Sequence, residues 1–340
     1  MTGLPGLDLD RLAAHLSTGP LTGELIPGGR SNLTYRITDG DQRWVLRRPP
    51  LGHVLATAHD MSREHRVIKA LADTAVPVPR VELLCEDADV IGAPFYLMEE
   101  VPGVALRHRD QCPWLTPDSA RVLSERLVEV LADLHAVDPA EVGLADFGRP
   151  DGFLTRQVAR WGKQLDASRS RELPGIDKLR DRLAGSVPDS ARATIVHGDY
   201  RLDNVLVTRD PLDISAVLDW EMATLGDPLA DVGLLCVYWN GIGAREGDGR
   251  EDDPITGTVP TLPGFAGTEE LVRRYAERSG ADTGNLAWYT AFAYFKLAVI
   301  LEGIHFRFTR GKTVGAGFDQ IGQLILPLVR QGLAASSGEH

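Results

Sequence analysis

Short apolar runs dominate the first hundred residues, and their spacing favours strands. β-Branched and aromatic residues gather in short segments that are separated by Gly, Pro, Asp and other turn-forming residues. Asp39-Gly40 lies between the first two segments and is typical of a hairpin turn. We therefore expect an antiparallel sheet whose strands are residues 30–38, 43–47, 81–85 and 94–99.

One helix interrupts these strands. Residues 58–73 are expected to form it, because their apolar residues follow helical spacing: Met61, Val67, Ile68 and Leu71. The prolines at positions 77 and 79 then exclude a helix, since they remove backbone donors and force an extended chain.

Helical spacing dominates after a break at residues 101–103. Two short β-branched runs, residues 194–196 and 205–207, lie among the helices. Residues 240–264 are rich in Gly, Asp and Pro, so we expect a long loop there that could serve as a lid. The expected helices are residues 116–135, 154–166, 268–279, 286–308 and 318–333.

Strands first and helices afterwards predict an α+β fold with two lobes. The N-lobe, residues 1–100, would be a small antiparallel sheet with one helix. The C-lobe, residues 101–340, would be mainly helical.

Charge restricts the class of partner. Of 340 residues, 36 are Lys or Arg and 48 are Asp or Glu, which gives a formal net charge of −12. We expect no nucleic-acid binding, because that requires a basic surface to neutralise phosphates. An apolar content of 43% is enough for a sizeable core.

Cysteine usage and apolar segments bear on the compartment. Three widely spaced cysteines without a CxxC pair argue against a zinc site and suit a reducing cytoplasm. The first ten residues lack a basic start and an apolar run, so no signal peptide is expected. The apolar residues 291–301 are interrupted by Lys296 and look too short to span a bilayer, so no membrane partner is expected. A homodimer is compatible with the sequence.

The strongest chemical signal is the segment His-Gly-Asp-Tyr-Arg-Leu-Asp-Asn at residues 197–204, followed by Asp219 after an apolar run. Phosphoryl transfer from a nucleotide needs these side chains, because one carboxylate positions the attacking hydroxyl while oxygen ligands hold Mg²⁺ against the phosphates. We expect Asp199 to act as the catalytic base, and Asn204 and Asp219 to bind magnesium. Asp203 is a weaker competitor for the base.

Two further residues have supporting roles in this prediction. His197 is expected to brace the loop by hydrogen bonds rather than transfer protons. Asp231 lies near the start of a helix that begins after Gly226 and could hydrogen-bond the backbone of the loop.

A glycine-containing segment before the first expected strand could hold phosphates, because glycines let backbone amides approach phosphate oxygens. An ordinary turn is the alternative. The candidates are Gly28, Gly29, Ser31 and Asn32.

A strand cation should bind the α- and β-phosphates. Val45 and Arg47 share one face of their strand, and this register selects Arg47, with Arg48 as the alternative. Glu64 lies beside the packing face of its helix and should pair with Arg47, since an unpaired buried charge is costly.

The end of the last strand could hold the adenine. Backbone groups of Glu99 and Val101 could hydrogen-bond its edge, with Met98 on its face. A buried strand that ends in a turn is the alternative.

These residues together resemble the aminoglycoside phosphotransferase and choline kinase-like superfamily, over residues 21–333. Residues 197–204 match its catalytic loop, His-Gly-Asp-x-x-x-x-Asn, and residues 218–220 match its metal-binding segment. The resemblance implies a bilobal protein kinase-like fold, with ATP and Mg²⁺ as cofactors and with the roles given above. Many members carry Lys where this chain has Arg47, which keeps the charge but is bulkier.

Residues 45–50, 220–228, 295–298 and 302–304 are similar to a branch of the superfamily associated with acyl-CoA dehydrogenases. That resemblance implies a hydroxyacyl-CoA acceptor. Aminoglycosides, choline-like amines and sugars remain alternative acceptors, GTP could replace ATP, and a nucleotide-binding module without turnover is the rival class. Lys296 and Arg307 share a helix face that could meet an anionic acceptor or simply be solvated.

Overall fold

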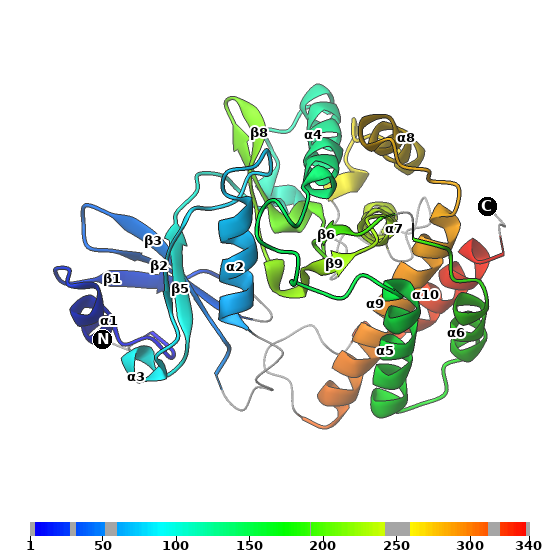
Figure 1. Ribbon diagram of the computed structural model, residues 1–340, viewed down its shortest axis with the longest axis horizontal. Helices are drawn as coiled ribbons and strands as arrows, with labels where there is room; N and C mark the ends of the chain where they lie inside the picture. Colours follow the sequence, from blue (N-terminus) through cyan, green and yellow to red (C-terminus); the bar gives the residue numbers. More distant parts are fainter. Residues whose placement is uncertain are drawn as a thin grey trace.

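The computed structural model describes residues 4–27, 32–51, 60–190, 192–241, 259–311 and 320–337. It confirms the α+β class and the two lobes (Figure 1). One half carries a five-stranded sheet, and the other carries long helices with two small ribbons of two strands each.

The sheet of the N-lobe is antiparallel throughout and has the strand order β1-β2-β3-β5-β4. The four expected strands are confirmed, with small differences at their ends. The strands are β1 (Thr22–Leu25), β2 (Leu33–Thr38), β3 (Arg43–Arg48), β4 (Val81–Cys85) and β5 (Phe95–Glu99).

The two faces of this sheet pack on different partners. Two short helices that were not expected, α1 (Leu9–Leu16) and α3 (Ala88–Ile91), lie on the outer face (Figure 1). The expected helix, α2 (Met61–Leu71), lies on the inner face between the sheet and the C-lobe. Its apolar side joins the main core, so the inner face of the sheet and the C-lobe share one core.

The C-lobe contains the expected helices and one that the sequence did not suggest, α6. Thr116 caps the first of them, and Pro117 occupies its first turn, as tolerated for proline. The helices are α4 (Pro117–Ala136), α5 (Phe153–Ser168), α6 (Ile176–Gly185), α7 (Leu229–Asn240), α8 (Thr268–Ser279), α9 (Leu286–Thr309) and α10 (Ile321–Ala335).

Two pairs of short antiparallel strands, here called ribbons, lie beside the helices of the C-lobe. They hold the loops that leave their strands. β6 (Thr194–Val196) pairs with β9 (Thr224–Gly226), and β7 (Val205–Arg209) pairs with β8 (Leu212–Val217). Single-turn 3₁₀ helices complete the lobe: η1 (Arg109–Gln111), η2 (Leu202–Asn204), η3 (Trp220–Met222) and η4 (Val259–Thr261).

Helix α9 is the central helix of the C-lobe and packs against α5, α7 and α10. Its 24 residues make it long and apolar enough to cross a membrane, so the expectation that this region is too short was wrong. However, 67% of its apolar window is buried inside the protein. A core helix passes the same test of length and composition, and burial accounts for the apolar sequence.

Candidate active site

The catalytic-loop segment begins where β6 ends, and a buried carboxylate fixes its backbone. Asp231 on α7 accepts hydrogen bonds from the backbone N–H of His197 at 2.6 Å and of Gly198 at 2.8 Å. Burial by itself raises the pKa of Asp231, but its hydrogen bonds, with the His135 ring first among them, hold that pKa below its ordinary value. The expected bracing contact of Asp231 is therefore present.

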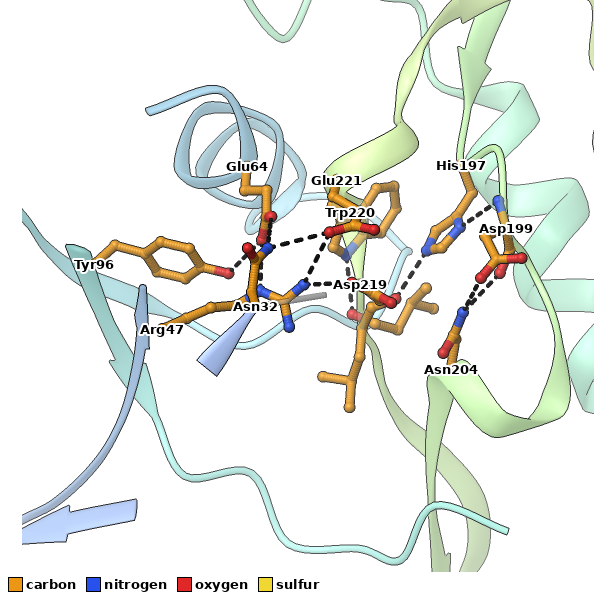
Figure 2. A network of polar contacts seen from close by, with 12 residues as sticks. Asn32, Arg47, Glu64, Tyr96, His197, Asp199, Asn204, Asp219, Trp220 and Glu221 are labelled. Atoms are coloured by element: carbon orange, nitrogen blue, oxygen red, sulfur yellow. Dashed lines mark hydrogen bonds and ion pairs between the residues drawn. The ribbon is translucent and has the colours of Figure 1, made fainter. Parts of the chain in front are cut away.

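His197 is fully buried, and both of its ring nitrogens are occupied. Nδ1 accepts the backbone N–H of Asp199 at 3.2 Å, so the proton lies on Nε2, which donates to the Leu218 carbonyl at 2.9 Å. The ring also packs on Trp220. His197 thus ties the loop to the segment that carries Asp219, as its bracing role requires (Figure 2).

Two neutral donors orient the Asp199 carboxylate. Tyr238 on α7 donates its hydroxyl to Oδ1 at 2.7 Å, and Asn204 donates its amide to Oδ2 at 2.9 Å. Burial raises the pKa of Tyr238 well above its ordinary value, so it remains a donor. Sequence reasoning missed Tyr238, although it lies seven positions after Asp231 and hence on the same face of α7.

Asp203 is held by a neighbour in the same loop. Arg201 pairs with it at 2.8 Å, and Arg201 also lies over the Tyr238 ring. Burial raises the pKa of Asp203 above its ordinary value, against the attraction of Arg201. Asp203 is therefore engaged with Arg201, whereas Asn204 and Tyr238 present the Asp199 carboxylate.

The β7–β8 ribbon brings Asn204 and Asp219 to the same end. Val205 pairs with Val217, and the Leu218 N–H donates to the Asn204 carbonyl at 2.8 Å. Asp219 has φ 67°, a left-handed conformation that costs free energy in a residue other than glycine. Two oxygen-bearing side chains from separate parts of the sequence thus lie on adjacent backbone segments.

Arg47 connects the two lobes. Its guanidinium pairs with Glu64 of α2 at 2.8 Å and also with Asp219 of the C-lobe (Figure 2). The predicted pairing of Arg47 and Glu64 is confirmed. Arg48 lies on the other face of β3, where it bonds the backbone carbonyls of Gly6 and Ile91.

Glu64 is 1% exposed and accepts hydrogen bonds from three side chains. Besides Arg47, Asn32 donates to it at 2.8 Å and Tyr96 at 3.0 Å. Burial raises the pKa of Glu64, while Arg47 and the donors act against that shift. Desolvation of a carboxylate is tolerable only with such partners, so this cluster fixes where the Arg47 guanidinium lies.

Glu221 is a second carboxylate at this junction that sequence reasoning missed. Asn32 donates to it at 3.2 Å, and Arg47 lies 3.9 Å from it. Its position two residues after Asp219 was the available signal. Of the expected phosphate segment, Asn32 joins the cluster, whereas Gly28, Gly29 and Ser31 lie outside the described residues.

The expected adenine contacts lie at the end of β5. Met98 is buried in the main core, and the N–H of Glu99 donates to the Arg80 carbonyl at 2.9 Å. The backbone N–H of Glu99 is therefore occupied, and its carbonyl and the groups of Val101 are what a nucleotide could use.

The donor set suits magnesium better than a transition metal. Within the described ranges, no group of three or more His, Cys, Asp or Glu side chains converges to hold a metal ion. Asn204 uses its amide nitrogen on Asp199, which leaves its amide oxygen for a cation. Asp219 pairs with Arg47 through Oδ1 and can offer its other carboxylate oxygen to the same cation. Mg²⁺ is commonly held by one or two protein oxygens plus phosphate oxygens, so these residues fit it.

Lys296 does not lie on a solvated stripe with Arg307. It is 9% exposed, and its Nζ donates to the Gly198 carbonyl at 2.7 Å, whereas Arg307 is exposed. Helix α9 crosses the core at Lys296 and reaches the surface only near its end. Of the expected lid at residues 240–264, positions 242–258 lie outside the described residues.

The sequence matches a family and several longer proteins. A model of the phosphotransferase enzyme family matches residues 22–271. Acyl-CoA dehydrogenase family member 10 of Mus musculus is 38% identical over 316 residues, which are 92% of this chain and 29% of the relative. Member 11 of Rattus norvegicus is 35% identical over 338 residues, 98% of this chain and 42% of the relative. This chain therefore spans less than half the length of these relatives.

Solved structures share the fold over almost the whole chain. A candidate aminoglycoside phosphotransferase from Ralstonia eutropha is 34% identical, with a TM-score of 0.82 over 97% of this chain and 98% of that one. A thermostable mutant of the aminoglycoside phosphotransferase APH(4)-Ia, in complex with AMP-PNP and hygromycin B, is 17% identical, with a TM-score of 0.62 over 97% of each chain. These likenesses confirm the kinase-like fold.

Proposed function

Because this chain belongs to the phosphotransferase enzyme family, we propose that it transfers the γ-phosphoryl group of ATP, with Mg²⁺, to a hydroxyl group of a small molecule. The observation that carries this proposal is the carboxylate of Asp199, oriented by Tyr238 and Asn204 in a loop that Asp231 braces. Positioning and electrostatics carry most of phosphoryl-transfer catalysis, and this loop supplies positioning.

Asp199 would act on the acceptor. One carboxylate oxygen of Asp199 accepts the proton of the acceptor hydroxyl. At the same time, the oxygen of that hydroxyl forms its bond to the γ-phosphorus. The bond from phosphorus to the bridging oxygen breaks, and ADP leaves with the electron pair. The two donors on Asp199 keep its oxygens in place for this proton transfer.

The opposite side of the site would hold the nucleotide. Arg47, anchored by Glu64, would bind the α- and β-phosphates, as the resemblance implies for the strand cation. Asn204 and Asp219 would hold Mg²⁺, which neutralises charge on the phosphate oxygens when bound. The carbonyl of Glu99, the backbone of Val101 and the side chain of Met98 would contact the adenine.

For the acceptor we propose a hydroxyacyl-CoA or a related metabolite. The support is the match of 92% and 98% of this chain to two acyl-CoA dehydrogenase family members. An aminoglycoside or a choline-like amine is the alternative acceptor, and a panel that compares hydroxyacyl-CoA esters with aminoglycosides separates them. The complete catalytic loop argues against a module without turnover.

The decisive experiment replaces Asp199 with Ala and measures ADP release and nucleotide binding. Turnover should fall by about a thousandfold, because the base is lost, while the thermal shift with Mg-ATP stays. The matched control is Asp203→Asn, which removes the competing carboxylate and should keep turnover within about tenfold of the native protein. Full activity of the Asp199 variant would sink the assignment.

A further inference from the structure

A row of cations lines one face of α5. Arg156, Arg160 and Lys163 are four and three positions apart, so they lie on the same side of the helix. With Arg149 they line an open cavity of about 540 Å³ at the surface, and all four side chains are exposed to solvent. The remaining lining residues are Phe153, Gln157, Ala159 and Thr224, with no carboxylate among them. This lining is opposite in sign to the whole chain, whose net charge is −12.

These positive charges have little compensation. In the described part of the chain, no carboxylate lies within ion-pair distance of Arg149, Arg160 or Lys163. Among the described residues, Arg156 donates only to backbone carbonyls, those of Arg149 and Asp151. Like charges at these spacings destabilise a helix, so the cluster is a cost to the folded protein unless an anion binds.

The cavity lies next to the catalytic loop. Thr224, at its edge, pairs with Val196, which immediately precedes His197 and is three residues before Asp199. Phe153 fixes α5 to the same ribbon, since a Cβ built on Gly226 would come within 2.6 Å of its ring. The cavity and the loop are therefore held by one two-stranded ribbon, β6–β9, beside α5 (Figure 1).

Positive charge continues from the cavity toward Asp199. Lys296 lies behind the loop, on the Gly198 carbonyl. Burial lowers the pKa of Lys296, while the charges of Asp199 and Asp231 act to raise it and the charge of Arg160 acts to lower it. Arg160 is therefore within electrostatic reach of the lysine that supports the loop.

We propose that this cavity binds the phosphate-bearing end of an anionic acceptor, whose hydroxyl then lies at Asp199. Four cations around a cavity of about 540 Å³ suit a group with several phosphates better than a lone carboxylate, and arginines bind phosphates bidentately. The inference rests on the proposed function for the identity of the reacting site. The positive lining of the cavity is opposite in charge to an aminoglycoside site, which would need carboxylates because aminoglycosides are cations.

The test measures binding by calorimetry with coenzyme A as the probe. The double variant Arg160→Gln/Lys163→Gln should weaken coenzyme A binding by about tenfold or more, because two charged contacts to phosphate are lost. Pantetheine, which lacks the phosphates, should bind the native protein much more weakly than coenzyme A. The matched control, Lys178→Gln/Arg330→Gln, removes two exposed cations outside the cavity and should leave binding unchanged.

Equal binding of coenzyme A to the native protein and the cavity variant would overturn the proposal, as would pantetheine binding as tightly as coenzyme A. The affinity for Mg-ATP should be the same in the native protein and the cavity variant, and a parallel loss would assign the cations to the nucleotide instead and also overturn it. Cation-dependent binding without any turnover would support the cavity and count against the proposed function. Turnover by the cavity variant with an unchanged KM for the acceptor would support the proposed function and overturn the role of the cavity.

Discussion

Lys296 is a buried cation beside the proposed base, and it contacts the catalytic loop through the backbone. Its bond to the Gly198 carbonyl fixes the residue before Asp199. We predict that Lys296→Met lowers kcat by about tenfold and leaves the KM for ATP unchanged, because the loop loses an anchor but the nucleotide contacts remain. Steady-state kinetics separate the two parameters, and Lys178→Met, at an exposed position, is the control.

The same substitution has a defined effect on stability. Burial lowers the pKa of Lys296, against the attraction of Asp199, while the unfolded chain keeps the ordinary value of 10.5. Between these values the unfolded chain binds more protons, so the stability of the native protein rises with pH. Urea unfolding should show this rise up to about pH 10 in the native protein and not in Lys296→Met. The same dependence of stability on pH in the native protein and in Lys296→Met would contradict a lowered pKa of Lys296.

Glu64 determines where the strand cation lies. Glu64→Gln removes the charge opposite Arg47 but keeps the size of the side chain. We expect the KM for ATP to rise about tenfold and the free energy of unfolding to fall by about 1–3 kcal/mol, since a buried charged hydrogen bond is lost. Glu86→Gln, at an exposed glutamate, should change neither quantity. An unchanged KM would show that Arg47 needs no anchor to bind nucleotide.

Among the elements, α7 places both Asp231 and Tyr238 at the catalytic loop. Its approach to α9 depends on Gly233, where a Cβ would lie 2.7 Å from the Tyr289 carbonyl carbon. We predict that Gly233→Ala costs about 1–3 kcal/mol of stability, because the helices must separate. It should also lower kcat, because α7 carries the brace and the donor.

The control for this prediction is Gly185→Ala at the end of α6, where no heavy atom beyond the adjacent residues and the backbone of the helix itself lies within 4 Å of the new Cβ. It should be neutral or stabilise by up to about 1 kcal/mol, since alanine favours helix. Denaturant unfolding of both variants checks the pair. An equal change in the free energy of unfolding for the two substitutions would show that the close contact of α7 with α9 at Gly233 does not contribute to stability.

The elements that the sequence predicted are those with a strong local pattern. Helix α8 was predicted at its observed ends, because apolar residues such as Leu271 and Tyr275 face the core at helical spacing. Strand β1 was missed because all of its side chains are exposed, and β9 because it is three residues long. The pairing of β6 with β9 is a long-range contact that no local pattern carries.

The same division applies to the candidate site. The Arg47–Glu64 pair followed from strand alternation and the cost of an unpaired buried charge. The burial of Lys296 was missed, because a lysine in an apolar helix can point to solvent until the neighbouring helices are known. The bond between Tyr238 and Asp199 joins elements 39 positions apart and needed the fold.

Over the whole molecule, the two faces of the N-lobe sheet contribute unequally to the site. The outer face, with residues such as Tyr35 and Leu46, forms a separate core with α1 and α3. The inner face, with Val45 and Met98, is continuous with the core of the C-lobe. Arg47 thus extends from a surface that is rigidly packed on the other lobe, and a nucleotide between them would contact both.

The β6–β9 ribbon has a consequence for selectivity. It holds the edge of the cationic cavity and the start of the catalytic loop in one hydrogen-bonded register, Val196 opposite Thr224. If the cavity holds the phosphates of an acceptor, this short ribbon, with Phe153 packed on Gly226, would keep their distance from Asp199 constant. The ribbon would then fix which hydroxyl of an acceptor reaches Asp199. The enzyme would phosphorylate a hydroxyl at one distance from the phosphates, while an isomer with its hydroxyl elsewhere on the chain would bind and remain unmodified.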